Sequence, residues 1–428
     1  MQDWSGYVED LGRRAREAAG NLAALRGETK IALLQRIAAG IRRGKGELLA
    51  ANARDLDAAE NAGLQPALIA RLRLDEKRIE SMAAGVEQIA QQVDPVGQII
   101  EGYVRPNGLR IQKRRVPIGV ILFFYESRPN VTSDAAALCI KSGNAVILRG
   151  GKEAIHSNRA IVQIINQAFS DLPGVPASAA LQGAVQLIES TDRALIPYLL
   201  KLDRYIDLVI PRGGESLIRA VVADSTIPVL KHFTGNCHIY IDADTHGMDE
   251  QVTNVCVNAK TSYPGGAVCN AVETILFHKS AATELLPTVC QALAGKGVEI
   301  RGDDATRRLF PPAKNATEED WAAEYLAFIV AVKVVDSLDE AVAHINHYGS
   351  HHTDAILSRS ISAIDTFTTR VDSASVMINA STRFADGGEY GLGAEIGIST
   401  DKLHARGPMG AADLTTYKWI VTGDGHVR

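Results

Sequence analysis

Cys269 is the residue in this sequence with the clearest potential for covalent chemistry. It follows a Pro-Gly-Gly turn at 264–266 and precedes a β-rich run. We expect this segment to place the thiol on a loop at the edge of a sheet, where backbone N–H groups can stabilise an oxyanion. A thiolate needs nearby cations or helix ends to form near neutral pH, and Lys260 could supply such a charge. The alternative is a buried structural cysteine, which is our interpretation of the other four: Cys139, Cys237, Cys256 and Cys290.

Two glycine turns could hold an anionic cofactor. One runs from Arg149 to Lys152 and carries two cations beside two glycines. The other, Gly213-Gly214, stands between an apolar run and a predicted helix, whose free N–H groups would suit a phosphate. The GxGxxG-like segment at 391–397 is one residue too long to be the dinucleotide fingerprint. On spacing alone, two ordinary strand-to-helix turns remain an equal alternative.

Two polar segments late in the chain could contact a substrate. Residues 379–400 are rich in glycine, hydroxyl groups and charge, a composition more typical of a binding loop than of an idle connection. Histidines gather at 344–352, where we expect hydrogen bonds to an anionic substrate or, alternatively, a solvated loop. No carboxylate or thiolate stands at ligand spacing there, so no metal site is expected.

The elements that position these residues follow from hydrophobic periodicity. The first 95 residues or so are predicted to be helical, with an apolar stripe at 33–41. Residues 98–117 are predicted to form a hairpin that turns at Asn107-Gly108 and leans on another domain or subunit.

From residue 116 onward, short apolar runs alternate with helical stretches, which predicts an α/β architecture with two parallel sheets. Strands are expected at 118–124, 145–148, 179–185, 206–210, 239–241, 272–277, 328–335 and 375–378. Helices are expected at 135–141, 157–169, 192–202 and 337–346.

Composition excludes several classes of protein. The 428 residues are 46% hydrophobic and 22% charged, which excludes disorder as the main state. No apolar run is long enough to span a membrane, and the charged first residues are unlike a signal peptide, so a cytoplasmic protein with no membrane association is expected. The net charge of −5 gives no sign of nucleic-acid binding.

Eight segments carry motifs that together form a family pattern. They are 116–121, 125–132, 141–153, 210–214, 258–261, 348–356, 378–388 and 402–410. They resemble the branch of the aldehyde dehydrogenase superfamily that reduces γ-glutamyl phosphate, and the resemblance covers essentially the whole chain. It implies an aldehyde-dehydrogenase-like α/β fold with two parallel-sheet domains and a small β oligomerisation flap. It also implies a homo-oligomer, either a dimer or a tetramer.

The resemblance further implies a division of the chain. The cofactor-binding domain would comprise 1–97 and 117–250, and the catalytic domain, which carries Cys269, would comprise 251–385. The flap would comprise 98–116 and 405–428. Residues 386–404 would form a substrate loop that returns to the cofactor domain.

The implied reaction is the NADPH-dependent reduction of L-glutamyl 5-phosphate to L-glutamate 5-semialdehyde. Phosphate would be released and a cysteine thioester formed, in the second step of proline biosynthesis from glutamate. By resemblance, Cys269 is the nucleophile and Asn130 the oxyanion donor. The implied NADP(H) contacts are Arg149 and Lys152 at the ribose and adenine, Gly213 and Gly214 at the pyrophosphate, and Glu324 at the nicotinamide ribose. Candidates for binding the substrate are Arg128, Lys260, Ser381 and Arg383.

One departure from the superfamily is informative. Hydrolytic aldehyde dehydrogenases carry a water-activating glutamate where this chain reads His-Phe-Thr-Gly at 232–235. A reductase that works through a thioester has no use for water at that step, so the missing carboxylate favours the reductase.

Three alternatives remain open from the sequence. One is a reductase of another acyl donor, such as an acyl-CoA. The second is a cysteine amidohydrolase without a cofactor. The third is a non-catalytic scaffold that binds glutamate 5-kinase. If the chain is the reductase, glutamate 5-kinase is also a possible transient partner.

Overall fold

The computed structural model describes residues 4–170, 181–231 and 233–428 and divides into two compact units. The first comprises Met1–Lys231, Gly391–Gly397 and Met409–Arg428, and the second comprises His232–Tyr390 and Ile398–Pro408. The division falls at residue 231, earlier than the boundary expected at 250, because β7 (Cys237–Ile241) pairs with strands of the second unit. The segment expected as a substrate loop, 386–404, is divided between the two units.

Helices open the first unit, as predicted. Their bounds are α1 Trp4–Ala23, α2 Gly27–Arg43, α3 Lys45–Asn61, α4 Pro66–Leu72 and α5 Glu76–Gln91. Helix α2 buries Leu33, Leu34 and Ile37 on the stripe read from the sequence. The Asp75 side chain caps α5 by accepting from the backbone N–H of Arg78.

A four-stranded parallel sheet in the order β5-β4-β3-β6 lies among these helices. Its bounds are β3 Val120–Phe124, β4 Ala145–Arg149, β5 Val185–Leu187 and β6 Leu208–Pro211. The helices that accompany it are α6 Asn130–Ser142, α7 Ile155–Ser170, α9 Ile196–Leu199 and α10 Glu215–Asp224. Strand β3 is buried at every position, which explains its unbroken apolar sequence.

Two predictions in this region are wrong in extent. The strand expected at 179–185 begins only at Val185, and its first two positions lie outside the described residues. The helix expected at 192–202 shrinks to α9, preceded by a 3-10 turn at Arg193–Leu195. Pro197 stands in the first turn of α9, the position at which a missing N–H is tolerated, and it thus marks the beginning of this short helix.

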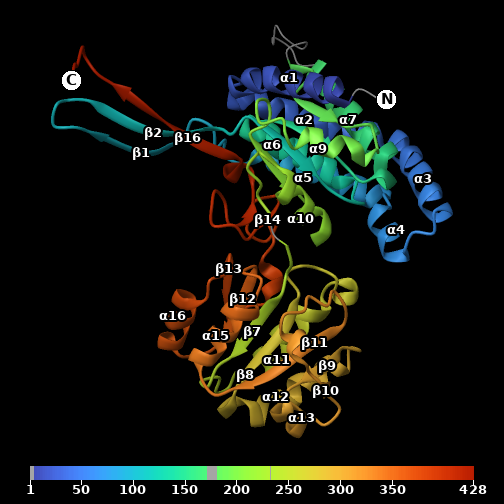
Figure 1. Ribbon diagram of the computed structural model, residues 1–428, viewed down its shortest axis with the longest axis vertical. Coiled ribbons are helices and arrows are strands. Elements are labelled where there is room, and N and C mark those ends of the chain that lie inside the picture. The colour runs from blue at the N-terminus through green and yellow to red at the C-terminus, as the bar shows by residue number, and fades with distance from the viewer. Residues whose placement is uncertain (1–3, 171–180, 232) are drawn as a thin grey trace. The chain divides into compact units, whose positions relative to one another are not determined.

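An antiparallel ribbon forms a third sheet of the chain (Figure 1). It consists of β1 (Ile99–Val104), β2 (Arg110–Pro117) and β16 (Thr415–Thr422). The predicted hairpin between β1 and β2 is confirmed, and Gly108 in its turn has a φ of +91°. Strand β16 comes from the end of the chain and pairs with β2 along its whole length.

The second unit is built on a parallel sheet in the order β10-β9-β11-β8-β7-β12-β13. Besides β7, its strands are β8 Val272–His278, β9 Glu299–Gly302, β10 Lys314–Asn315, β11 Ile329–Val335, β12 Thr353–Leu357 and β13 Ser375–Ile378. Its helices are α11 Asp249–Thr261, α12 Lys279–Ala294, α13 Asp304–Leu309, α14 Glu318–Trp321, α15 Leu338–Tyr348 and α16 Ile361–Arg370. Two further short strands, β14 (Gly397–Ser399) and β15 (Gly407–Met409), pair with each other.

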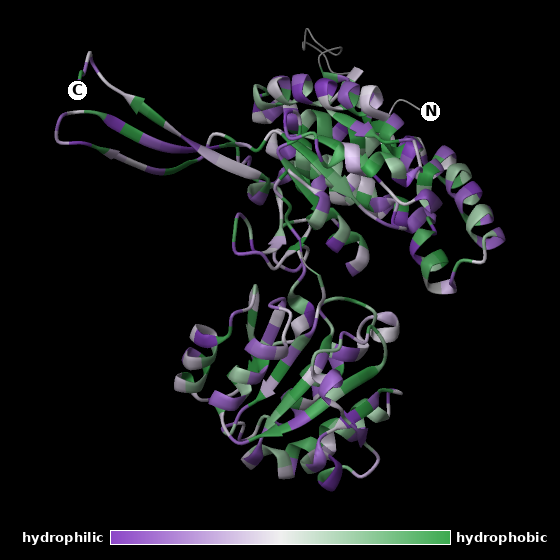
Figure 2. Cartoon of the chain, in the orientation of Figure 1, coloured by the Kyte–Doolittle hydropathy of each residue, from purple (hydrophilic) through white to green (hydrophobic). Residues whose placement is uncertain are grey.

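The core of this second sheet explains which strands the sequence revealed. Strands β7, β8 and β11 bury apolar side chains against helices α11 and α12, and Figure 2 shows this sheet largely in the green of hydrophobic residues. Strand β12 was missed because Asp354 interrupts its apolar pattern. The Asp354 carboxylate is nevertheless fully buried, where it accepts from the backbone N–H of His238 at 2.8 Å and from Ser373.

None of the helices in the described ranges combines the length and the apolar character that a membrane span requires.

Candidate functional site

Six of the predicted site residues lie at one edge of the first unit's sheet. The chain leaves the carboxyl ends of β3, β4 and β6 at that edge, because parallel strands all end on the same side. Ligands of open α/β sheets bind beyond this edge. The residues are Arg128 and Asn130 after β3, Arg149 and Lys152 around the end of β4, and Gly213 and Gly214 after β6.

The glycine pair after β6 is arranged to receive an anion. Gly214 is the N-cap of α10, and its backbone N–H lies 3.4 Å from Oε1 of Glu126. A Cβ on Gly213 would come within 2.7 Å of the same oxygen. The start of α10 therefore already holds a negative charge of the chain itself, as expected at the positive end of a helix.

Arg149 adds a cation at the same edge. Its Nη2 donates to the backbone carbonyl of Asp192 at 3.3 Å, while its Nε is buried without an acceptor among the described residues. Burial lowers the pKa of Arg149, but a guanidinium stays charged at neutral pH. A buried N–H that lacks an acceptor favours a ligand anion. Arg149 thus fits a phosphate group of a dinucleotide, whereas at the glycine turn the anion position is taken by the Glu126 carboxylate.

Asn130 is the first residue of α6, so its side chain stands beside the free backbone N–H groups of the helix start. The amide is partly exposed, and its Nδ2 donates to Oδ2 of Asp134 at 3.0 Å. An amide donor held at a helix start suits the stabilisation of an oxyanion.

In the second unit, Cys269 differs from the other four cysteines in its exposure. It lies on the loop between the 3-10 turn Pro264–Gly266 and β8, and its side chain is partly exposed. The loop position predicted for it is confirmed. The remaining four thiols are buried, and burial raises the pKa of each above its ordinary value. They stay protonated, so Cys269 is the thiol placed for chemistry.

The backbone of Cys269 is held by two neighbours. The Sγ of Cys237 donates to the carbonyl oxygen of Cys269 at 3.2 Å. Gly235 lies so close that a Cβ there would stand 2.0 Å from the same oxygen and 2.6 Å from the Cα of Cys269. Gly235 ends the segment that lacks the glutamate of the hydrolytic enzymes, whose first residue, His232, lies outside the described residues.

Substituting Gly235 by Ala is expected to lower kcat by about 100-fold, because the new methyl group must displace the backbone of Cys269, and a shift of about 1 Å can have that effect. Steady-state kinetics and the melting temperature would be measured together. The control is Gly46→Ala, since a Cβ at Gly46 meets nothing within 4 Å. Equal kcat in the two variants would show that Gly235 does not fix the thiol.

Lys260 lies beneath this region as half of a buried ion pair. Its Nζ is 2.6 Å from Oε2 of Glu273, and both side chains are fully buried. Burial lowers the pKa of Lys260 and raises that of Glu273, whereas their mutual attraction acts in the opposite direction on each. Glu324 is close enough to raise the pKa of Lys260 as well. A role in supporting the site therefore fits Lys260 better than the predicted contact with a substrate phosphate.

Arg383 and Ser381 lie beside the residue that follows Cys269. The Nη1 of Arg383 donates to Oδ1 of Asn270, and its Nε donates to Oγ of Ser262 at 3.2 Å. The Ser381 hydroxyl accepts from the backbone N–H of Arg383 at 3.3 Å. The structure thus brings the predicted substrate residues Ser381 and Arg383 to the Cys269 loop.

The histidines that were predicted to contact a substrate differ in their exposure to solvent. His344 is buried, and burial lowers its pKa to about 2. His352 is also buried, whereas His347 is exposed. No group of three or more histidine, cysteine or acidic side chains is arranged to hold a metal in the part of the chain that the structure describes.

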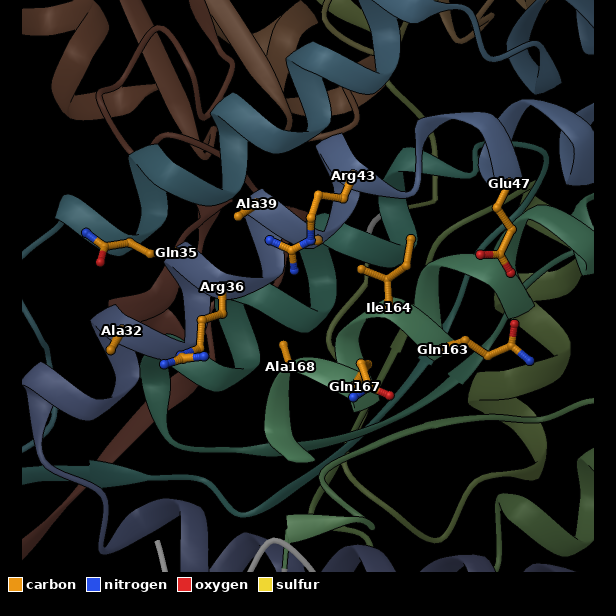
Figure 3. Close-up of a pocket in the computed structure, with 11 residues that line it drawn as sticks. Ala32, Gln35, Arg36, Ala39, Arg43, Glu47, Gln163, Ile164, Gln167 and Ala168 are labelled. Carbon is orange, nitrogen blue, oxygen red and sulfur yellow. The ribbon is translucent and has the colours of Figure 1, made fainter. Parts of the chain in front are cut away.

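A groove of about 760 Å³ between α2 and α7 lies apart from the predicted site residues. Figure 3 shows Arg36 and Arg43 on one side of it and Gln163 and Gln167 on the other. None of the predicted cofactor or substrate residues lines this groove, so it forms no part of the candidate site.

The sequence interpretation missed the supporting roles of three residues: Asp134, Gly235 and Glu273. Asp134 stands four residues after Asn130, a spacing that places both on one face of a helix, and this signal could have revealed it. Gly235 and Glu273 act through contacts that only the folded chain creates.

The chain is similar to a known protein family and to named members of it over most of its length. The sequence profile of the aldehyde dehydrogenase family matches residues 6–307. The γ-glutamyl phosphate reductase of Caldanaerobacter subterraneus is 51% identical over 421 residues, which cover 98% of this chain and 99% of the relative. That of Rhodopirellula baltica is 50% identical over 426 residues, which cover 100% of this chain and 96% of the relative.

The crystal structure of γ-glutamyl phosphate reductase from Thermotoga maritima superposes with a TM-score of 0.94 at 43% identity, covering 98% of this chain and 99% of that one. The predicted aldehyde-dehydrogenase-like fold is therefore confirmed. The chain belongs to the aldehyde dehydrogenase family of oxidoreductases and, within it, to the γ-glutamyl phosphate reductases.

Proposed function

We propose that this chain reduces L-glutamyl 5-phosphate to L-glutamate 5-semialdehyde with NADPH, by way of a thioester on Cys269. The observation that carries the proposal is the partly exposed Cys269 thiol in a member of this family, on a backbone that packs against Gly235 and accepts a hydrogen bond from Cys237. The relatives are named for the reduction of γ-glutamyl phosphate, and this name supports the choice of substrate.

In the first step, the Cys269 thiolate attacks the acyl phosphate carbon and forms a carbon–sulfur bond. The carbonyl electron pair moves to oxygen, and Asn130 and the backbone N–H of Cys269 donate to that oxyanion. When the oxyanion collapses, the bond from carbon to the phosphate oxygen breaks and phosphate leaves. Phosphate is a good leaving group that needs charge stabilisation rather than a proton, for which Arg128 and Arg383 are the candidate cations.

When bound, NADPH would supply the hydride that reduces the thioester carbon in the second step. The residues that would hold it are Arg149, Lys152, Gly213 and Gly214, with Glu324 at the nicotinamide ribose. The reduced carbon then releases Cys269 as a thiolate and leaves as the aldehyde. The absence of a glutamate at 232–235 protects the thioester from hydrolysis before this release.

The reverse assay tests the proposed reaction. Purified protein would be given L-glutamate 5-semialdehyde and NADP⁺, with and without inorganic phosphate, while nicotinamide absorbance is followed. NADPH is expected to form only when phosphate is present, because phosphate is needed to cleave the thioester. Formation of NADPH without phosphate would indicate an acid-forming dehydrogenase, and a requirement for coenzyme A would indicate an acyl-CoA reductase.

The preference for NADPH is expected to depend on Lys152, an exposed cation just after β4. Substituting Lys152 by Glu should raise KM for NADPH roughly tenfold or more, because the 2′-phosphate loses a charge-assisted bond and meets a negative charge. KM for NADH should change far less. Lys201→Glu is the control, since Lys201 is also exposed and lies outside the candidate site. Equal effects on the two cofactors would remove Lys152 from 2′-phosphate recognition.

Self-association is proposed to use the three-stranded ribbon. Tyr417, Trp419 and Val421 alternate along β16 on one face and are 49%, 47% and 57% exposed. Exposed apolar side chains in such a row mark an interface. Val421→Glu is expected to shift the protein to a smaller species in light scattering, whereas Thr416→Glu on the other face of the strand should not. An unchanged mass for Val421→Glu would argue against this interface.

A further inference from the structure

Helix α6 begins with a pair of side chains whose contact restricts how Asn130 can be oriented. The Nδ2 of Asn130 donates to Oδ2 of Asp134 at 3.0 Å, across one helical turn. An ionised carboxylate only accepts hydrogen bonds, so it must face the amide nitrogen and not the amide oxygen. One N–H of Asn130 is thereby engaged, and its second N–H is left to donate elsewhere.

Other groups hold the same arrangement from several sides. Oγ of Ser133 donates to the backbone carbonyl of Asn130 at 2.8 Å, which fixes the first turn of α6. Arg212, in the turn after β6, is the charged group that favours the ionised form of Asp134. Gly85 on α5 faces Asp134, and a Cβ there would stand 4.0 Å from Oδ1.

We propose that Asp134 is a positioning residue, which orients the Asn130 amide so that its free N–H donates to the oxyanion of the acyl phosphate reaction. The inference rests on the proposed function of Asn130 and assigns Asp134 no contact with the substrate. A side chain that holds a catalytic donor in one orientation contributes through preorganisation.

The arrangement predicts a dependence on pH. Burial raises the pKa of Asp134 to about 6, although Asn130, Arg212 and Ser133 all act to lower it. Above that pH the ionised carboxylate accepts from Asn130. Below it the carboxyl gains a proton, becomes a donor, and no longer selects the amide nitrogen. The rate is therefore expected to decline on the acid side of about pH 6.

The test is a double-mutant cycle with Asn130→Ala, Asp134→Asn and the combined variant, assayed in the phosphate-dependent reverse direction. Asp134→Asn should lower kcat by about tenfold or more with KM for NADP⁺ within about twofold of the unaltered protein, because only the orientation of the donor is lost. The combined variant should be no slower than Asn130→Ala. The acid limb of the kcat profile near pH 6 should be absent from Asp134→Asn.

The melting temperature separates positioning from a structural role. Because the folded chain raises the pKa of Asp134, it disfavours the charged form, so Asp134→Asn should melt no lower than the unaltered protein at pH 7.5. The control is Asp57→Asn, which removes an equal charge from an exposed site on α3 and should leave kcat unchanged. Additive losses in the combined variant, or an acid limb that persists in Asp134→Asn, would overturn the proposal. If Asn130→Ala alone has no effect, the proposed role of Asn130 fails first, and the positioning role fails with it.

Discussion

Replacing Cys269 by Ala is expected to abolish turnover, with a loss of at least about 10⁴-fold in kcat. Without the thiolate no covalent intermediate can form, and losing a nucleophile removes nearly all the acceleration that its site provides. The fold should survive, because the side chain is partly exposed and fills no core position. The measurement is the rate of phosphate-dependent NADPH formation, together with the Kd for NADPH and the melting temperature.

The matched control for this variant is Cys290→Ala, which removes a thiol buried within α12. It should retain turnover and lose some stability, since it leaves a small cavity. The account is contradicted if Cys269→Ala keeps near-normal turnover, or if the two variants lose activity to the same degree.

Replacing Asn130 by Ala is expected to lower kcat by about 10² to 10³-fold, equivalent to about 2.7–4 kcal/mol of transition-state stabilisation. The loss should fall on kcat rather than on the KM for NADP⁺, because the donor acts on charge that develops during the reaction. The measurement is steady-state kinetics in the reverse direction.

Asn61→Ala is the control for Asn130→Ala, since Asn61 is exposed at the end of α3 and lies outside the candidate site. A large loss of melting temperature in Asn130→Ala, with normal kcat in the protein that remains folded, would mean that Asn130 is structural.

Much of the fold could be predicted because parallel strands that are buried on both faces consist mainly of apolar residues. Strand β3 is an unbroken apolar run, whereas β8 includes Glu273 and β11 includes Lys333 among apolar residues; the sequence placed all three strands within a few residues. Strand β12 (Thr353–Leu357) was not predicted. In β12 the buried Asp354 is stabilised by His238, which lies on the neighbouring strand β7, so no local signal could reveal it.

The sequence could predict those residues of the candidate site whose type and local sequence indicate a chemical role. A cysteine after a Pro-Gly-Gly turn and glycines before a helix are readable along the chain. The partners that fix them are not, since they come from contacts distant in sequence. Lys260 illustrates the limit, because its ammonium looks available in the sequence but is buried against Glu273 in the fold.

The most direct test of the central claim is to trap the acyl-enzyme. Protein would be mixed with freshly generated L-glutamyl 5-phosphate in the absence of NADPH, quenched in acid, digested and analysed by mass spectrometry. We expect a glutamyl adduct on the peptide that contains Cys269, which disappears when NADPH is added before the quench. An adduct on another cysteine, or reduction of the substrate by protein that never carries an adduct on Cys269, would contradict the account.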